Sequence, residues 1–374
     1  MAGIYIHIPF CKKKCTYCDF HFSTTFESYR KEMIAALCNE IQMRSPAFFS
    51  GEPLTTIYFG GGTPSLLTPE ELETILTAVH QNNSTETVEE ITLEANPDDI
   101  TEENLTGWKK AGINRLSIGL QSFREQDLQW MNRAHSVEEG ESAIRKAQKF
   151  GFTNLTVDLM YGLPDLSQTE WKEHIYKLTD LNVPHISAYC LTVEPKTTLH
   201  HLVGTNKIHV PDEDTQAEQF ELLIQTLREK GYEHYEISNF CLPGQYAKHN
   251  SNYWKNRKYL GIGPSAHSYD GENRFWNPAN NTRYIQSVQS GKHTPEKEHL
   301  SPENRFNELL LTGLRTIWGV DLQQLSDTLP LTDAFRTEME HFIQAGDLQL
   351  SGNTIRLTQQ GKLKADYIAS ALFV

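Results

Sequence analysis

Cys11-Lys12-Lys13-Lys14-Cys15-Thr16-Tyr17-Cys18 gathers three of the chain's six cysteines into one short segment. The C-x3-C-x2-C spacing lets three thiolates from a single loop converge on one inorganic centre. A [4Fe–4S] cube has four irons, so three cysteines leave one iron open to a small-molecule ligand. A structural zinc site would instead need a fourth protein ligand, for which His21 is available. We expect the cluster, because zinc would leave the polar loops further along the chain without a purpose.

The surroundings of the cysteines add two expectations. The three lysines inside the motif should lower the pKa values of the thiols and favour an anionic cluster. The other cysteines, Cys38, Cys190 and Cys241, have no partner spacing, and we expect Cys38 and Cys190 to be small buried apolar residues. Sparse cysteines without a framework of pairs indicate a reducing compartment.

Outward from the motif, apolar strands alternate with helical patterns over the first 200 residues or so. Three of the helices begin with Ser or Thr followed three residues later by Glu, which is a capping box. Such alternation is typical of a parallel sheet with right-handed crossovers. The expected strands are 3–8, 55–59, 90–94, 113–119, 153–159 and 185–191, and the expected helices lie near 27–44, 69–82, 101–111, 136–150 and 168–181.

Polar or glycine-rich residues accompany the end of nearly every expected strand. The first strand leads to the cysteines, the second to Gly60-Gly61-Gly62-Thr63-Pro64, and the fourth to Gln121. Contributions from all six strands favour a barrel whose site lies on its C-terminal face, whereas an open sheet concentrates its site at one switch point. The sequence therefore predicts an α/β protein with a partial TIM-like (β/α)6 barrel over residues 1–210.

The alternation of strands and helices ends after the barrel. Residues 211–295 should form an extension with a helix at 212–230, a short strand at 232–237 and a loop-rich aromatic stretch at 240–290. Within it, Gly261-Ile262-Gly263 is expected to be a tight turn, and 291–298 a polar linker. Residues 296–374 should form a small winged-helix-like α+β domain, with helices at 301–314, 333–345 and 359–371 and a hairpin between the last two.

Composition excludes several classes of function. The chain has 374 residues and a formal net charge of −14, which argues against a dominant nucleic-acid or anionic-membrane surface. Its first residues carry no signal-peptide pattern, and its apolar runs are of strand length. We therefore expect a cytoplasmic protein without a membrane anchor.

Taken with the loops in their order along the chain, the cysteine motif resembles the radical S-adenosylmethionine superfamily. That resemblance implies a cluster held by Cys11, Cys15 and Cys18, whose open iron binds S-adenosylmethionine and whose electron cleaves the sulfonium to a 5′-deoxyadenosyl radical. Gly61, Gly62 and Thr63 are similar to the glycine motif that meets the methionine moiety. The further contacts that the resemblance implies are Tyr5, Tyr17, Glu94, Gln121, Arg133, Asp158 and Thr192.

Within the superfamily the chain resembles the oxygen-independent coproporphyrinogen III oxidase family, which has two branches. The oxidase carries a further cysteine two residues after the third, where this chain has Phe20, and an N-terminal extension, where this chain has ten residues before Cys11. His249-Asn250-Ser251-Asn252-Tyr253-Trp254 matches the H-N-x-x-Y-W motif of the other branch, the HemW-type haem chaperones. These three features favour the chaperone branch.

The haem site expected from this resemblance also follows from the chemistry of haem, which needs an axial donor and flat apolar walls. We expect His249 to be the axial ligand, with His267 as a rival and His7 and His200-His201 as weaker ones. Tyr253, Trp254, Phe275 and Trp276 could supply the walls.

The resemblance implies a chaperone that delivers haem to haem proteins such as respiratory enzymes. The alternatives are oxidative decarboxylation of coproporphyrinogen III, which we do not expect, and radical chemistry on another substrate.

Overall fold

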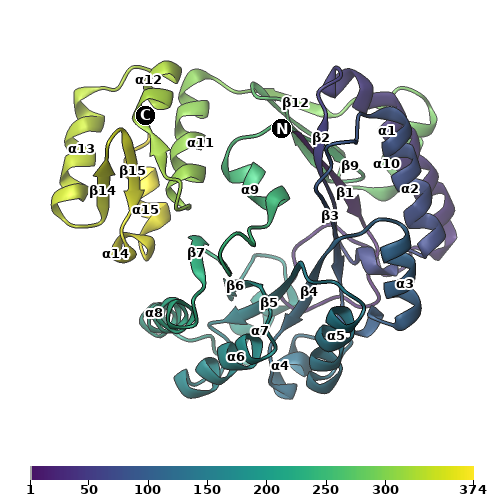
Figure 1. Ribbon diagram of the computed structural model, residues 1–374, viewed down its shortest axis with the longest axis horizontal. Coiled ribbons are helices and arrows are strands. Elements are labelled where there is room, and N and C mark those ends of the chain that lie inside the picture. The colour runs from purple at the N-terminus through teal and green to yellow at the C-terminus, as the bar shows by residue number, and fades with distance from the viewer. Residues whose placement is uncertain (1) are drawn as a thin grey trace.

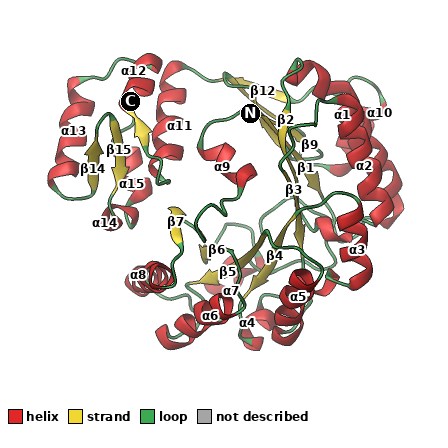
Figure 2. Cartoon of the chain, viewed as in Figure 1, coloured by secondary structure: helices red, strands yellow, loops and turns green. Residues whose placement is uncertain are grey.

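Within residues 2–374, which the computed structural model describes, a 12-stranded sheet runs through most of the molecule. Its centre is formed by six parallel strands that pair in chain order, and their helices lie around the outside of the curve (Figures 1 and 2). The strands are β1 (Ala2–Ile8), β2 (Leu54–Gly61), β3 (Glu90–Ala95), β4 (Arg115–Gln121), β5 (Leu155–Tyr161) and β6 (His185–Cys190). The predicted partial (β/α)6 barrel is confirmed.

The helices between these strands begin where their capping residues are. Thr68, Ser136 and Ser167 each accept a hydrogen bond from the backbone of a glutamate three residues later, and that glutamate bonds back, as the sequence predicts. The helices are α1 (Arg30–Phe49), α2 (Pro69–Asn82), α3 (Glu102–Lys110), α5 (Val137–Lys149) and α6 (Gln168–Asp180). Two short helices were not predicted, α4 (Glu125–Trp130) and α7 (Thr198–Gly204).

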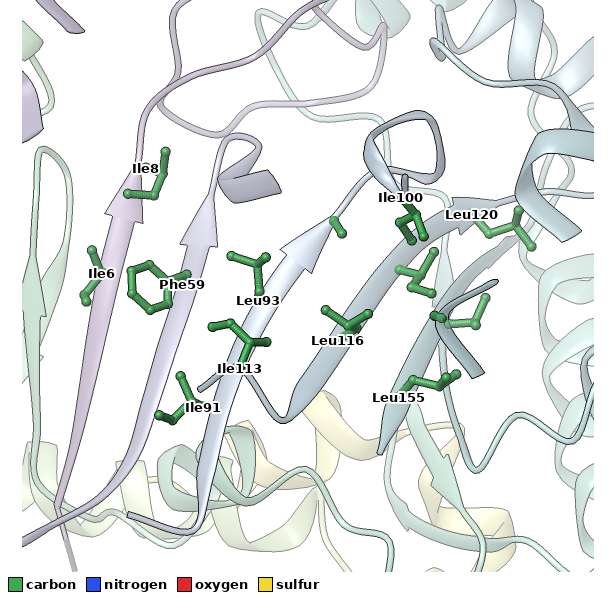
Figure 3. Close-up of a cluster of buried hydrophobic side chains, with 14 of the residues drawn as sticks. Ile6, Ile8, Phe59, Ile91, Leu93, Ile100, Ile113, Leu116, Leu120 and Leu155 are labelled. Atoms are coloured by element: carbon green, nitrogen blue, oxygen red, sulfur yellow. The ribbon is translucent and has the colours of Figure 1, made fainter. Parts of the chain in front are cut away.

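The core forms on one face of the parallel strands. Successive side chains of a strand point to opposite faces, so every second residue packs against the helices. Figure 3 shows such residues along β1 to β5, all buried, including Ile6, Phe59, Leu93, Leu116 and Leu155. The intervening residues of these strands face the inside of the curve, where the site lies.

Beyond β1 the sheet continues through the aromatic region. β9 (Tyr259–Ile262) pairs parallel with β1, and β10 (His267–Tyr269), β11 (Asn273–Trp276) and β12 (Glu296–His299) follow as antiparallel neighbours. The prediction of a loop-rich stretch at 240–290 was therefore wrong, and so was that of a tight turn at Gly261-Ile262-Gly263, since β9 contains its first two residues. The predicted linker is shorter than expected, because only 291–295 lie outside helices and strands and β12 follows. Strands of three or four residues are too short to show a two-residue period. The region also contains α9 (Lys248–Trp254) and α10 (Asn281–Gln289).

A buried carboxylate on α1 ties this extension to the barrel. Glu40 accepts hydrogen bonds from the backbone N–H of Gly263 (2.8 Å), the amide of Asn277 (2.8 Å) and the hydroxyl of Tyr284 (2.6 Å). It also pairs with Arg44 and lies 3.2 Å from His293. Burial alone would raise the pKa of Glu40, but His293 and Arg44 outweigh it and hold the pKa below its usual value. We call this cluster the Glu40 knot.

On the other side of the barrel, β6 pairs antiparallel with β8 (Asn239–Cys241), and β8 pairs with β7 (Glu233–Glu236), which follows α8 (Glu213–Glu229). The C-terminal unit docks on β7. The backbone N–H of Ile237 donates to the carbonyl of Arg315 at 3.0 Å, and that of Ile317 donates to Tyr235 at 3.0 Å. The unit therefore covers this edge of the sheet.

The C-terminal unit has its own core, which includes Phe306, Leu310, Ile355 and Ile368. Its helices pack around a small antiparallel sheet, as the sequence predicts. The chain breaks the expected last helix in two and adds one short helix, and the boundaries at 210 and 295 remain predictions. The elements are α11 (Pro302–Leu314), β13 (Val320–Asp321), α12 (Leu322–Thr328), α13 (Asp333–Gln344), β14 (Leu348–Ser351), β15 (Thr354–Leu357), α14 (Gln359–Lys362) and α15 (Ala365–Ala371). None of the helices in residues 2–374 has the length and apolar character needed to cross a membrane.

Replacing the carboxylate of Glu40 should weaken the attachment of the extension to the barrel. We expect Glu40→Ala to lower the free energy of unfolding by about 3–5 kcal/mol, because it leaves Arg44 and several donors buried without their acceptor. Urea titration followed by circular dichroism measures this change. The control Glu32→Ala removes an exposed carboxylate from the same helix and should change stability by about 0.5 kcal/mol or less. Equal losses in the two variants would contradict the role of the knot.

Candidate functional site

A cavity of about 470 Å³ opens at the carboxyl ends of the parallel strands, and we call it the polar cavity after its cysteine and charged side chains. The cysteines reach it from the loop after β1, the glycines from the end of β2, and the charged residues from β3 to β5 and the loop after α4. Every residue predicted to hold the cluster or S-adenosylmethionine lines this cavity, except Tyr5. The lining includes Cys11, Cys15, Cys18, Tyr17, Gly61, Gly62, Thr63, Glu94, Gln121, Arg133, Asp158 and Thr192. The structure therefore brings these residues together, while their roles as ligands remain predictions.

The cysteines are held by neutral and cationic donors on the cavity wall. Thr63 Oγ1 donates to Cys11 Sγ (3.3 Å), and Arg133 Nη1 donates to Cys15 Sγ (3.6 Å). Burial raises the pKa of Cys11 to about 12 and that of Cys18 to about 11. Metal binding would have to displace these protons, because thiolates are the ligands.

The prediction that the neighbouring lysines lower the thiol pKa values was wrong. Lys12 turns to two carboxylates instead, lying 2.7 Å from Asp98 and also pairing with Asp99. An ion pair satisfies the ammonium there, and the guanidinium of Arg133 is the cation that contacts a cysteine sulfur.

The arrangement of the cysteines suits a cluster. In a [4Fe–4S] cube each cysteine binds a different iron, so the sulfurs surround the cube rather than meeting at one point. All three line one cavity, and a charge on Cys15 or Cys18 raises the pKa of Cys11. Within residues 2–374 no group of three His, Cys, Asp or Glu side chains could hold a single metal ion. His21, the fourth ligand considered for zinc, bonds to Asn281 through Nε2 at 2.7 Å.

Opposite charges share the rest of the cavity. Burial raises the pKa of Glu94 to about 7 and that of Asp158 to about 7. Arg133 donates to the carbonyl of Gly119 (2.5 Å) and to Asn96 (2.9 Å), while its Nε is buried without a hydrogen-bond partner among the described residues. A ligand that carries both a positive and a negative group would stabilise the ionised carboxylates and satisfy the guanidinium.

Glycine is required where the second strand meets the cysteines. Gly61 has a φ of +108°, and a Cβ there would lie 2.6 Å from the ring of His7. A Cβ on Gly62 would lie 2.7 Å from the carbonyl oxygen of Phe10 and 3.1 Å from Cys11 Sγ. The backbone can approach the cysteine loop only because these side chains are missing.

A second, aromatic cavity of about 540 Å³ adjoins the first. Three residues line both cavities: Phe20, whose side chain is 68% exposed, Gly61 and Glu94. Tyr5, Tyr253 and Trp254, which the sequence placed among the cofactor contacts, lie here. The other lining residues are His7, His21, Tyr259, Ser265, Ala266 and His267.

His249, the predicted haem ligand, lies behind the aromatic cavity and is not among the residues that line either cavity. It belongs to α9 rather than to a loop, and only 1% of its surface is exposed. Its Nδ1 lies 2.8 Å from Thr56 Oγ1 and its Nε2 lies 2.8 Å from the hydroxyl of Tyr253. Burial lowers its pKa to about 3. Ligation by His249 would require both hydrogen bonds to break, and it remains a prediction.

Phe275 and Trp276, which were expected as walls of the haem site, are not among the residues that line the aromatic cavity. Phe275 packs near Phe48, with ring centroids 6.4 Å apart, and Trp276 stacks on His267. Cys38 and Cys190 were both expected to be buried, but both are half-buried against the core, and Cys190 also lines the polar cavity.

Several site residues were not predicted: Ser117, Met160 and Tyr189 also line the polar cavity, and two others contact its charged groups. Asn96 binds Arg133, and Tyr58 donates to Glu94 at 2.8 Å. Asn96 directly follows a strand, and Tyr58 lies two residues before Gly60 on the inner face of its strand, so both carried a positional signal.

Comparison with known proteins gives matches along the chain. The radical SAM superfamily profile matches residues 5–178, and the HemN C-terminal domain profile matches residues 300–363. The heme chaperone HemW of Bacillus subtilis is 33% identical, covering 99% of each chain. HemW of Escherichia coli is 32% identical over 96% of this chain and 95% of its own. The solved structure of coproporphyrinogen III oxidase (HemN) from Escherichia coli superposes with a TM-score of 0.85 at 22% identity, covering 100% of this chain and 90% of that one, which shows the shared fold.

The raised pKa of Glu94 makes stability depend on pH. The Glu94 carboxyl binds its proton more tightly in the folded chain than in the unfolded one. The folded state therefore loses stability relative to the unfolded state as pH rises from about 4.5 through 7. We expect Glu94→Gln to raise the stability of the ligand-free protein by about 1–3 kcal/mol at pH 8, with a much smaller gain at pH 5. Thermal unfolding at both pH values measures this, with the exposed Glu73→Gln as control. A gain that is equal at the two pH values would contradict the raised pKa.

Proposed function

Because the chain belongs to the HemW family of the radical SAM superfamily, we propose that it is a cytoplasmic haem chaperone. It holds a [4Fe–4S] cluster and S-adenosylmethionine in the polar cavity, takes haem into the aromatic cavity, and passes haem to haem proteins such as respiratory enzymes. The observation that carries this proposal is the adjacency of the two cavities, which share Phe20, Gly61 and Glu94 as a common wall.

The polar cavity supplies complementary groups for its two cofactors. Cys11, Cys15 and Cys18 would hold three irons and leave the fourth for the amino and carboxylate groups of S-adenosylmethionine. When bound, the cluster would supply one electron for cleavage of the sulfonium. Glu94 and Asp158 line the same cavity and would offer carboxylates to that positive charge, and the missing side chains at Gly61 and Gly62 would permit close approach. Arg133, which donates to Cys15, would balance part of the charge of a bound cluster.

Additional side chains would hold the nucleoside part of the cofactor. Tyr17 presents an aromatic ring on the cavity wall, and Gln121 and Thr192 present polar groups there. These assignments rest on the resemblance to the superfamily and on the shared cavity.

The aromatic cavity has the features of a site for a flat macrocycle. Its volume lies in the range of sites for drug-sized ligands. Tyr5, Tyr253, Trp254 and Tyr259 present ring surface to the ligand, and such rings bury large apolar area at a defined orientation. Imidazoles on the same wall offer axial donors.

Oxidation of coproporphyrinogen III is the second candidate, since the whole chain superposes on a structure of that oxidase. A tetrapyrrole cavity beside a radical SAM cavity would suit either function. At the position of the oxidase's additional cysteine this chain carries the exposed Phe20, which cannot ligate metal or transfer a proton. That difference favours the chaperone.

An anaerobic assay with reductant and S-adenosylmethionine separates the two candidates. One arm offers haem and the other coproporphyrinogen III. We expect a stable haem complex, seen as a shifted Soret band after gel filtration, and no protoporphyrinogen. Formation of protoporphyrinogen would overturn the chaperone proposal, and so would a failure to retain haem.

Iron analysis tests the cluster. After anaerobic reconstitution, we expect about four irons per chain in the native protein and a large loss in Cys15→Ala, because one of three thiolates is missing. Cys38→Ala removes a half-buried cysteine from α1, away from the cavity lining, and should keep the native iron content. An unchanged iron content in Cys15→Ala would contradict the assignment of the motif.

A further inference from the structure

We propose that His267 is the axial ligand of haem and that His249 positions Tyr253 in the cavity wall without touching iron. The inference rests on the proposed function, since it concerns the haem cavity. It departs from the sequence pattern, in which His249 is the expected ligand.

Three imidazoles line the aromatic cavity, and two of them are engaged. His7 lies 3.2 Å from the hydroxyl of Tyr5 through Nδ1 and 2.9 Å from the carbonyl of His21 through Nε2. His21 uses Nε2 for Asn281. Among the hydrogen bonds of residues 2–374, none involves a ring nitrogen of His267. Of the three, His267 alone has both nitrogens available.

The ring of His267, an exposed residue of β10, lies against one aromatic neighbour that is itself held in place. It faces Trp276 across the β10–β11 pair, and the two rings stack with centroids 6.2 Å apart and an angle of 27°. Trp276 is held in turn by a hydrogen bond from Nε1 to Glu296 at 2.9 Å.

The strand that carries His267 is anchored to the barrel. The hydroxyl of the next residue, Ser268, accepts a hydrogen bond from the backbone N–H of Gly261 at 2.9 Å and lies 3.4 Å from Arg44 of the Glu40 knot. A ligand on this strand therefore has a fixed distance to the shared wall of the cavities.

His249 has the contacts of a positioning residue. Besides its bonds to Thr56 and Tyr253, its ring stacks on Tyr58 with centroids 5.0 Å apart. A Cβ on Gly3 would lie 3.1 Å from the same ring, so β1 closes over it. Through Tyr253, which lines the cavity, His249 fixes an aromatic wall rather than the iron.

Titration of the purified protein with ferric haem, followed by absorbance and electron paramagnetic resonance, tests the assignment. We expect His267→Ala to lose the native Soret position and low-spin signal, to bind haem roughly tenfold or more weakly, and to regain the native spectrum with added imidazole. The matched control His21→Ala removes another imidazole from the same cavity and should keep the native spectrum.

The role of His249 is tested by two variants that spare the fold. His249→Gln retains groups that can bond to Thr56 and Tyr253, and Tyr253→Phe removes only the hydroxyl that His249 holds. Both should keep the native Soret position, with affinity reduced at most several-fold. A changed axial signature in His249→Gln that imidazole restores, with His267→Ala unchanged, would overturn the inference. No haem binding by the native protein would overturn the proposed function instead.

Discussion

The two-residue alternation of side chains along six parallel strands is the constraint on which the rest of the molecule depends. It sends Leu93 and Leu116 outward to the helices and leaves Glu94, Ser117 and Asp158 facing inward. Because the carboxyl ends of parallel strands meet at one rim, residues far apart in the chain share one cavity there. A one-residue slip in any strand would exchange its two faces and bury the carboxylates among the helices.

The Glu40 knot extends this order to the aromatic region. It joins one helix of the barrel to the segments that carry Gly263, Asn277 and Tyr284, all through buried polar contacts. Such contacts specify one arrangement, because each donor that missed its acceptor would be costly in the interior. The aromatic cavity therefore sits at a fixed place against the polar one. Phe20 and Glu94 face both, so an occupant of either cavity meets side chains that the other also touches.

The sequence predicted the parts of the molecule that local patterns encode. Long apolar strands with capped helices fixed the barrel, and motif order brought the cysteines together with Arg133 and Asp158. The strands of the extension were missed because the parallel pairing of β9 with β1 joins residues about 250 positions apart, and these strands are too short to show a period. His249 was chosen because it begins the H-N-x-x-Y-W motif and is a haem donor by type, and neither property carries information on burial. Lys12 was expected to act on the cysteines because it is next to them in the chain, but the fold brings it to Asp98 instead.

The two edge strands of the 12-stranded sheet bear on the tendency of the protein to aggregate. An uncovered strand offers free N–H and C=O groups on which another chain can pair, and apolar strands such as β1 are the most hazardous. Here β9 shields β1, and the sheet ends on one side at β12, whose Glu296, Lys297, Glu298 and His299 are all exposed. On the other side, the backbone of the C-terminal unit occupies the rim of β7. The C-terminal unit thus acts as a cap against edge-to-edge aggregation at this end of the sheet.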